Sequence, residues 1–187
     1  MDPYCRLINR EFTLSETYVP EDLVPCDFPF AASEHAEKRL LCRAAAEAAK
    51  HLLKYGKSFG CYLYGISGYR SYDRQREIYE QRLREAGPEY TCQYIARPGE
   101  SEHQSGLALD LSCPAVHLEL EEAFASTGEG RWLSAYAPMF GFILRYPRGK
   151  ESITGYAWEP WHIRYVGKSL ALYLSLTGMT LEEYHRI

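Results

Sequence analysis

The sequence lacks the features that would indicate a membrane-spanning, nucleic-acid-binding or zinc-finger protein. It contains no run of about 18 apolar residues, so no membrane span is expected. It has no block of basic residues and its net charge is −4, which argues against nucleic acid or an anionic membrane surface as a partner. None of its 6 cysteines belongs to a CxxC pair, so a thiolate zinc knuckle is not expected either.

The N-terminus lacks a signal peptide, because Met1-Asp2-Pro3-Tyr4 is followed by charged and polar residues. Two expectations stay open: a cytoplasmic protein, or a cell-envelope protein whose N-terminal export or anchor segment has been removed. Reduced and mainly buried thiols are expected, although a surface disulfide that involves Cys5 or Cys26 stays open. No cysteine has the His and Asn or Asp partners of a nucleophile, so cysteine catalysis is not expected.

The length of 187 residues predicts one domain, 1–187, with a substantial core. Residues 1–32 contain 4 prolines and little periodicity, so they are expected to form an extended strap. Beyond them, hydrophobic periodicity and capping signals predict helices over 33–55, 72–86, 131–140 and 168–177, and strands over 61–66, 106–112, 142–146 and 161–166. A capping box at Thr180 is expected to begin a last short helix. This order predicts an α+β fold with a small antiparallel β-sheet flanked by helices.

The most informative stretch is SEHQSGLALD at residues 101–110. Strand alternation from Gly106 to Ser112 would place Asp110 on the face opposite the three leucines. A carboxylate in an apolar strand needs compensation, which a metal would supply, and His103 lies in a loop that can fold back over it. Taken alone, such an aspartate is more often paired with an arginine, and such a histidine is more often structural.

A second stretch, EPWH at residues 159–162, supplies another imidazole and another carboxylate. Pro160 excludes a helix interior, so Glu159 and His162 do not belong to an HExxH helix. Together the two stretches contain what a zinc hydrolase requires: three nitrogen or oxygen ligands, an open position and a separate carboxylate for proton transfer.

Arg70 is predicted at a corner between a strand and the helix over 72–86, in the segment SGYRS at 67–71. A guanidinium at such a corner suits recognition of a carboxylate, because its fork matches two oxygens. A structural salt bridge is the alternative.

These stretches occur in a characteristic order: SGYRS, SEHQSG with Asp110, GFILRYP at 141–147, and EPWHIRYVG at 159–167. The chain closely resembles the VanY and VanXY D-alanyl-D-alanine carboxypeptidases over nearly its whole length. These belong to a zinc peptidase group that includes L,D-carboxypeptidases and, more distantly, VanX dipeptidases and hedgehog domains. The resemblance implies the hedgehog and D-Ala-D-Ala peptidase fold.

The resemblance also implies a site. His103, Asp110 and His162 are expected to bind one zinc ion, and Glu159 is expected to act as the general base. Arg70 is expected to contact the substrate and to offset negative charge that develops during hydrolysis. Ser101 and Gln75 match positions at which the family contacts the peptide, although Ser101 could equally be a turn or cap hydroxyl.

The expected activity is removal of the C-terminal D-amino acid, D-alanine above all, from a peptidoglycan stem peptide or its precursor. Two other specificities stay open: L,D-carboxypeptidase action on tetrapeptide stems, and a dual activity that also cleaves free D-Ala-D-Ala, as VanXY proteins do. A zinc-stabilised binding domain without catalysis is the remote alternative. VanXY proteins are cytoplasmic and VanY proteins usually carry a membrane anchor, so the resemblance leaves the bacterial compartment open, and the oligomeric state is unknown.

Overall fold

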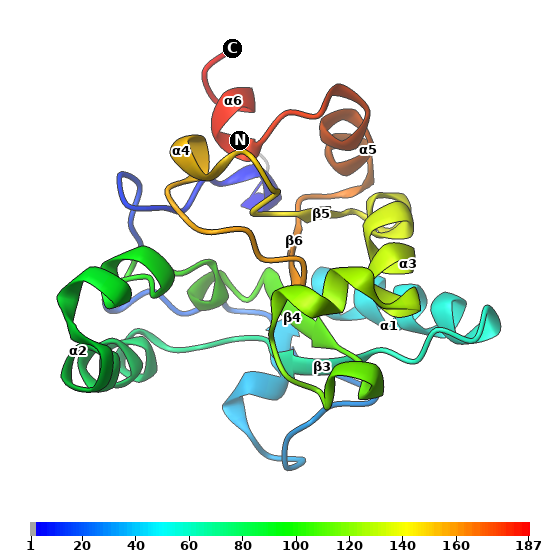
Figure 1. Cartoon of the computed structure of the whole chain (residues 1–187), viewed down its shortest axis with the longest axis horizontal. Coiled ribbons are helices and arrows are strands. Elements are labelled where there is room, and N and C mark those ends of the chain that lie inside the picture. The colour runs from blue at the N-terminus through cyan, green and yellow to red at the C-terminus, as the bar shows by residue number, and fades with distance from the viewer. Residues whose placement is uncertain (1–2) are drawn as a thin grey trace.

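The structure is a computed structural model that describes residues 3–187 and combines helices with two small antiparallel sheets (Figure 1). The helices are α1 Arg43–Ser58, α2 Tyr72–Tyr94, α3 Gly128–Tyr136, α4 Glu151–Thr154, α5 Lys168–Thr177 and α6 Leu181–Tyr184. The strands are β1 Leu23–Pro25, β2 Leu40–Cys42, β3 Tyr64–Ser67, β4 Ala108–Ser112, β5 Phe142–Leu144 and β6 His162–Tyr165. This confirms the expected α+β class with helices around a small antiparallel sheet.

The larger sheet has the strand order β3-β4-β6-β5, and every neighbouring pair is antiparallel. All five residues of β4 are buried. Leu109 and Leu111 join the main hydrophobic cluster with residues of α1 such as Ala49 and Leu52. The alternation predicted for this strand is therefore confirmed, and it leaves Asp110 on the other face.

The prediction of a helix over 33–55 is wrong for its first ten residues, 33–42. Residues 37–39 form a 3-10 helix, and Leu40–Cys42 form β2, which pairs antiparallel with β1. Because the preceding strap offers an edge with which this apolar segment can pair, tertiary pairing overrides its local helix preference. Helix α1 then begins at Arg43 and extends to Ser58.

Helix α2 begins as predicted, with Ser71 accepting a hydrogen bond from the backbone N–H of Arg74. The predicted end at Gly87 is also visible, since Gly87 has φ 79° and breaks the helical geometry. The chain does not become a loop there, however, and a further helical segment runs from Pro88 to Tyr94. Proline is well suited to the first turn of a helix, which explains why the segment resumes.

The N-terminal strap lies against the segment that contains His103. Gln104 donates hydrogen bonds from Nε2 to the carbonyls of Ser15 and Tyr18, at 2.8 and 3.2 Å. The backbone N–H of Leu14 donates to the carbonyl of Gly99 at 2.8 Å. The strap therefore helps to fix the position of the loop that precedes β4.

All 6 cysteines lie within residues 3–187. Cys26, Cys42 and Cys113 are buried, whereas Cys92 is exposed. Burial raises the pKa of the Cys26 thiol to about 12. Cys26 is a buried free thiol, so it does not form the disulfide that was left open for it. Reduced thiols stay an expectation for the other cysteines.

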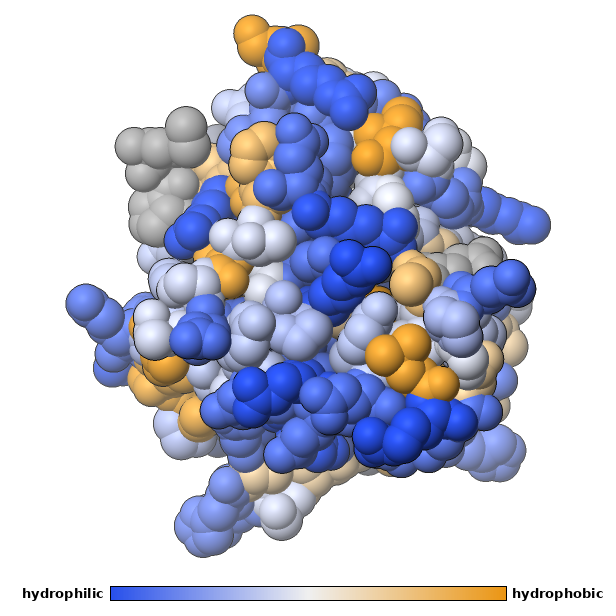
Figure 2. Space-filling model, turned by 90° about the vertical axis from the view of Figure 1, so that its left-hand side faces the viewer, coloured by the Kyte–Doolittle hydropathy of each residue, from blue (hydrophilic) through white to orange (hydrophobic). Residues whose placement is uncertain are grey.

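The C-terminal elements match the sequence closely. Helix α5 has the predicted bounds, and Thr180 and Glu183 form the predicted capping box at α6. None of the helices among residues 3–187 is both long and apolar enough to cross a membrane. The face of the molecule on the side of α2 is mainly hydrophilic, and its hydrophobic side chains occur in small separate patches (Figure 2).

Candidate active site

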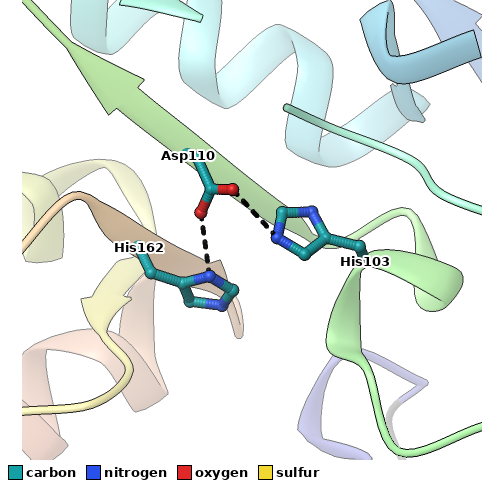
Figure 3. Close-up of side chains that lie close together, drawn as sticks. All are labelled: His103, Asp110 and His162. Atoms are coloured by element: carbon teal, nitrogen blue, oxygen red, sulfur yellow. Dashed lines mark hydrogen bonds and ion pairs between the residues drawn. The ribbon is translucent and has the colours of Figure 1, made fainter. Parts of the chain in front are cut away.

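Asp110 and His162 are brought together by strand pairing. They are direct partners in the antiparallel register of β4 and β6. Side chains at directly opposed positions lie on the same face of the sheet. Oδ1 of Asp110 lies 2.9 Å from Nδ1 of His162 (Figure 3). Two residues 52 positions apart in the sequence thus point toward the same place.

His103 reaches this point from the 3-10 helix Glu102–Ser105, which precedes β4. Gly106 follows with φ 68°, a left-handed conformation that glycine adopts without strain, and this turns the chain into the strand. Nδ1 of His103 lies 2.6 Å from the carbonyl oxygen of Gly68, to which it donates a hydrogen bond. Nε2 lies 3.2 Å from Oδ2 of Asp110. Since Nδ1 carries the hydrogen, Nε2 presents a lone pair toward a carboxylate.

Together the three side chains have the chemistry of a metal site. One nitrogen or oxygen atom of each residue lies within 4.8 Å of the others, and all three residues are buried. Figure 3 shows both imidazoles turned toward the Asp110 carboxylate, each from a different segment. Two imidazole nitrogens and one carboxylate oxygen are a donor set of catalytic zinc sites, in which a fourth position stays open. The residues present therefore fit a zinc ion.

The pKa values of His103 and Asp110 suit this role, whereas that of His162 opposes it. Burial lowers the pKa of His103, and nearby Arg70 lowers it further, so this imidazole is neutral as a ligand must be. Burial alone would raise the pKa of Asp110, but the two imidazoles hold it well below its usual range. Burial also opposes the charged form of His162, yet Asp110 and Glu102 raise its pKa to about 10. A metal that binds here must therefore displace a proton from His162.

Glu159 lies at the edge of this cluster. Its backbone N–H donates to the carbonyl of Tyr146 at 3.1 Å, and its Oε2 lies 3.7 Å from Nδ1 of His162. Its side chain is 18% exposed, compared with 5% for Asp110 and His162. Burial raises its pKa to about 7, and the carboxylates of Asp110 and Glu102 contribute to this shift. Residues 157–161 are not helical, which confirms that this is not an HExxH helix.

Arg70 follows β3 and is held beside the cluster. Its backbone N–H donates to the carbonyl of His103 at 3.2 Å. Its guanidinium donates to Oε1 of Gln75 at 2.8 Å and to Oγ of Ser67 at 3.2 Å. The charges of Asp110 and Glu159 act on it, although it makes no salt bridge among the residues that the structure describes. The structural salt bridge that was the alternative for Arg70 is therefore not observed, and hydrogen bonds to Gln75 and Ser67 position the guanidinium instead.

Gln75 and Ser101 lie in the same region. Gln75 is 1% exposed, and its Nε2 donates to the carbonyl of Ala96 at 2.6 Å. Since its oxygen already accepts from Arg70, its visible contacts position that arginine. Ser101 is buried and makes no side-chain capping bond to the 3-10 helix that follows. Direct contact of either residue with a substrate stays a prediction.

The sequence interpretation missed a buried network of charged residues behind His162. Oε1 of Glu102 accepts hydrogen bonds from Nε of Arg145 and from Nη1 of Arg164, both at 2.7 Å. Arg145 also forms an ion pair with Glu182 at 2.5 Å. A signal was present, because Arg145 and Arg164 interrupt apolar segments and buried charges require partners. What the sequence could not show was which carboxylates they meet.

The raised pKa of Glu159 predicts a stability effect in protein stripped of metal. The folded-state pKa of about 7 lies above the ordinary value of 4.5, so the fold loses stability as the pH rises from about 4.5 to about 7, and the loss is complete above pH 7. Glu159→Gln removes this penalty. The free energy of unfolding should rise by about 3 kcal/mol at pH 8 but by only about 1 kcal/mol at pH 5.

Urea unfolding in the presence of a chelator measures this difference. Glu80→Gln, at an exposed position of α2, is the matched control and should change stability by less than about 0.5 kcal/mol at either pH. Equal effects of Glu159→Gln at pH 5 and pH 8 would contradict the raised pKa.

Two imidazoles and a carboxylate that converge on one point, with a further carboxylate at the edge, form the arrangement that peptide hydrolases use. The chain belongs to the VanY family of D-alanyl-D-alanine carboxypeptidases, whose family model matches residues 38–168. This range contains all seven residues expected at the site. The family assignment made from the motifs is thus confirmed.

Curated relatives agree with this assignment. The Bacillus subtilis protein YodJ is 45% identical over 178 residues, which cover 95% of this chain and 65% of YodJ. The chain thus spans slightly less than two thirds of that relative. VanXYC of Enterococcus gallinarum, a bifunctional D-Ala-D-Ala dipeptidase and carboxypeptidase, is 35% identical over 187 residues, which cover 96% of this chain and 92% of VanXYC.

Solved structures share the fold. The LdcB LD-carboxypeptidase superposes with a TM-score of 0.92 at 44% identity, covering 96% of this chain and 84% of that one. A VanY D,D-pentapeptidase from a VanB-type resistance cassette, solved in complex with Zn(II), has a TM-score of 0.78 at 30% identity, covering 98% and 99%. Both likenesses extend over nearly all of this chain.

Proposed function

We propose that this chain is a zinc-dependent carboxypeptidase that removes the C-terminal D-alanine from a peptidoglycan stem peptide or its precursor. The observation that carries the proposal is the convergence of His103, Asp110 and His162 within 4.8 Å, with the non-ligand carboxylate of Glu159 beside them. The Zn(II) complex of the VanY relative supports the choice of metal. One zinc ion per chain is proposed, because one such cluster occurs among residues 3–187.

The bound metal would act as a Lewis acid toward the scissile carbonyl and would lower the pKa of water. Glu159 would take a proton from the attacking water and deliver it to the leaving amine. Burial raises its pKa to about 7 in the metal-free protein, and the positive charge of a bound zinc would lower this value, so that the group is ionised and can accept the proton at neutral pH. Arg70, already oriented by Gln75 and Ser67, would offset the negative charge that develops on the substrate.

Substrate recognition is proposed to involve Arg70, Ser101 and Gln75. A C-terminal carboxylate suits the planar fork of Arg70, which has no carboxylate partner of its own among the described residues. Ser101 has a hydroxyl that is not used for capping. Gln75 would act mainly by holding Arg70 in place.

L,D-carboxypeptidase action on a tetrapeptide stem is the second candidate. The superposition on the LdcB LD-carboxypeptidase is better than that on VanY, with TM-scores of 0.92 and 0.78. A dual enzyme that also cleaves free D-Ala-D-Ala is the third, supported by the similarity to bifunctional VanXYC. The presence of Glu159 beside the ligands argues against a binding domain without catalysis.

A time course followed by mass spectrometry tests these specificities. Protein loaded with zinc receives a muramyl pentapeptide, a tetrapeptide or free D-Ala-D-Ala, and Glu159→Ala serves as the control. We expect loss of one alanine from the pentapeptide. Loss from the tetrapeptide would instead identify an L,D-enzyme, and cleavage of the dipeptide as well would identify a dual enzyme. Full zinc occupancy with no change in any substrate would contradict the proposal.

The compartment in which the protein acts depends on whether its substrate is a peptidoglycan precursor or assembled peptidoglycan. The relatives are bacterial, so we propose a role in the bacterial cell wall, either on cytoplasmic precursors or on envelope peptidoglycan. Cell fractionation followed by immunoblotting of the native protein distinguishes the two locations.

A further inference from the structure

Glu102 and His162 each have a buried side-chain atom without a hydrogen-bond partner, and these two atoms face each other. Among residues 3–187, Oε2 of Glu102 and Nε2 of His162 both belong to the small set of buried polar atoms without a partner. They lie 3.7 Å apart. Buried polar atoms are normally hydrogen-bonded, so each atom is the natural partner that the other lacks.

The charged residues around Glu102 leave this oxygen free for His162. Arg145 and Arg164 both donate to Oε1 of Glu102, at 2.7 Å each. The side chains of Glu102, Arg145 and Arg164 are all 0% exposed, and Glu182 balances the second positive charge through Arg145. The carboxylate is thus held from one side, with its other oxygen directed toward His162.

The ring of His162 is also fixed by its other contacts. Its Nδ1 points toward Oδ1 of Asp110 at 2.9 Å, on the side where the ligand atoms converge. The ring of Tyr146 lies 4.9 Å away at an angle of 38° and covers one face. Only Nε2 points away from the ligand cluster, toward Glu102.

We propose that Glu102 is a positioning residue for His162: its Oε2 accepts a hydrogen bond from Nε2–H and so leaves the lone pair of Nδ1 for zinc. The inference rests on the proposed function in one respect, that His162 is a metal ligand. It assigns opposite tautomers to the two histidines, because His103 donates from Nδ1 to Gly68 and presents Nε2 to the metal. Carboxylates that orient ligand histidines in this way contribute about 10–100-fold to metal affinity.

The alternative is that Glu102 only neutralises Arg145 and Arg164. The matched control is therefore Glu182→Gln, which removes a negative charge from the same buried network. Glu182 bonds to Arg145 and to Asn9, on the far side of the network from His162. Both Glu102→Gln and Glu182→Gln should destabilise the fold, but only the first should change the metal site.

Competition titration against a chromophoric chelator measures zinc affinity. We expect Glu102→Gln to weaken zinc binding about 10–100-fold, and Glu182→Gln to leave it within about twofold. The visible spectrum of the cobalt(II)-substituted protein should change for Glu102→Gln alone. Affinities within twofold and identical cobalt spectra for both variants would overturn the proposal.

A second measurement does not depend on how well the variants fold. Long-range proton–nitrogen NMR of the zinc-loaded wild-type protein reports the tautomer of each histidine ring. We expect hydrogen on Nε2 of His162 and on Nδ1 of His103. Hydrogen on Nδ1 of His162 would overturn the inference while leaving the proposed activity intact. Failure of the wild-type protein to bind one equivalent of zinc would instead overturn the proposed function, and this inference with it.

Discussion

Glu159→Ala is expected to abolish turnover while zinc stays bound. The three proposed ligands do not include Glu159, whose carboxylate lies 3.7 Å from Nδ1 of His162 and is more exposed than theirs. The loss of a general base typically reduces a rate by about 10²–10⁴-fold. We therefore expect kcat to fall by about 10³-fold or more, with zinc content still close to one ion per chain.

The pH dependence gives this prediction a second readout. The base must be ionised, so kcat/KM of the wild-type enzyme should rise with pH through the pKa of Glu159. That pKa is about 7 in the metal-free protein, and the positive charge of zinc lowers it, so the rise should lie below pH 7. The residual activity of the variant should lack this rise.

Glu80→Ala is the control, because Glu80 is an exposed carboxylate on α2 and should leave both kcat and zinc content unchanged. Rates come from the release of D-alanine, and zinc content comes from elemental analysis of the same samples. If Glu159→Ala kept more than about a tenth of the wild-type kcat, another group would have to be the base.

The convergence of the three proposed ligand residues could be predicted from the sequence because their geometry depends on local patterns. Alternation in a buried strand placed Asp110 opposite the leucines, and the structure confirms it. Pro160 excluded a helix at the second motif, and no helix forms there. Asp110 and His162 come together because β4 and β6, the two short strands that carry them, are neighbours in one sheet.

The buried charges could not be predicted because their partners are distant in the sequence. Glu102 meets Arg145 and Arg164, which lie 43 and 62 positions further along the chain. The beginning of α1 was missed for a similar reason. Leu40–Cys42 has no strand signal strong enough to outweigh a helical pattern, and it becomes β2 only because β1 lies alongside it.

His162→Ala is expected to lose both zinc and activity. The variant removes one of three protein ligands, and it also leaves the carboxylates of Asp110, Glu102 and Glu159 without the imidazole between them. Structural zinc sites with four ligands bind with roughly 10–16 kcal/mol, or about 3 kcal/mol for each ligand. The loss of one ligand should therefore weaken zinc binding by at least about a hundredfold.

His51→Ala is the matched control, since His51 is an exposed histidine on α1 and should retain full zinc and full activity. Dialysis at a fixed free zinc concentration, followed by metal analysis, gives the occupancy of each variant. Full occupancy of His162→Ala would remove this residue from the ligand set. The pattern expected across the two histidine variants and Glu159→Ala is specific: rate and zinc are lost together at His162, rate alone is lost at Glu159, and neither is lost at His51. A residue that only supported the fold would not separate rate from zinc in this way.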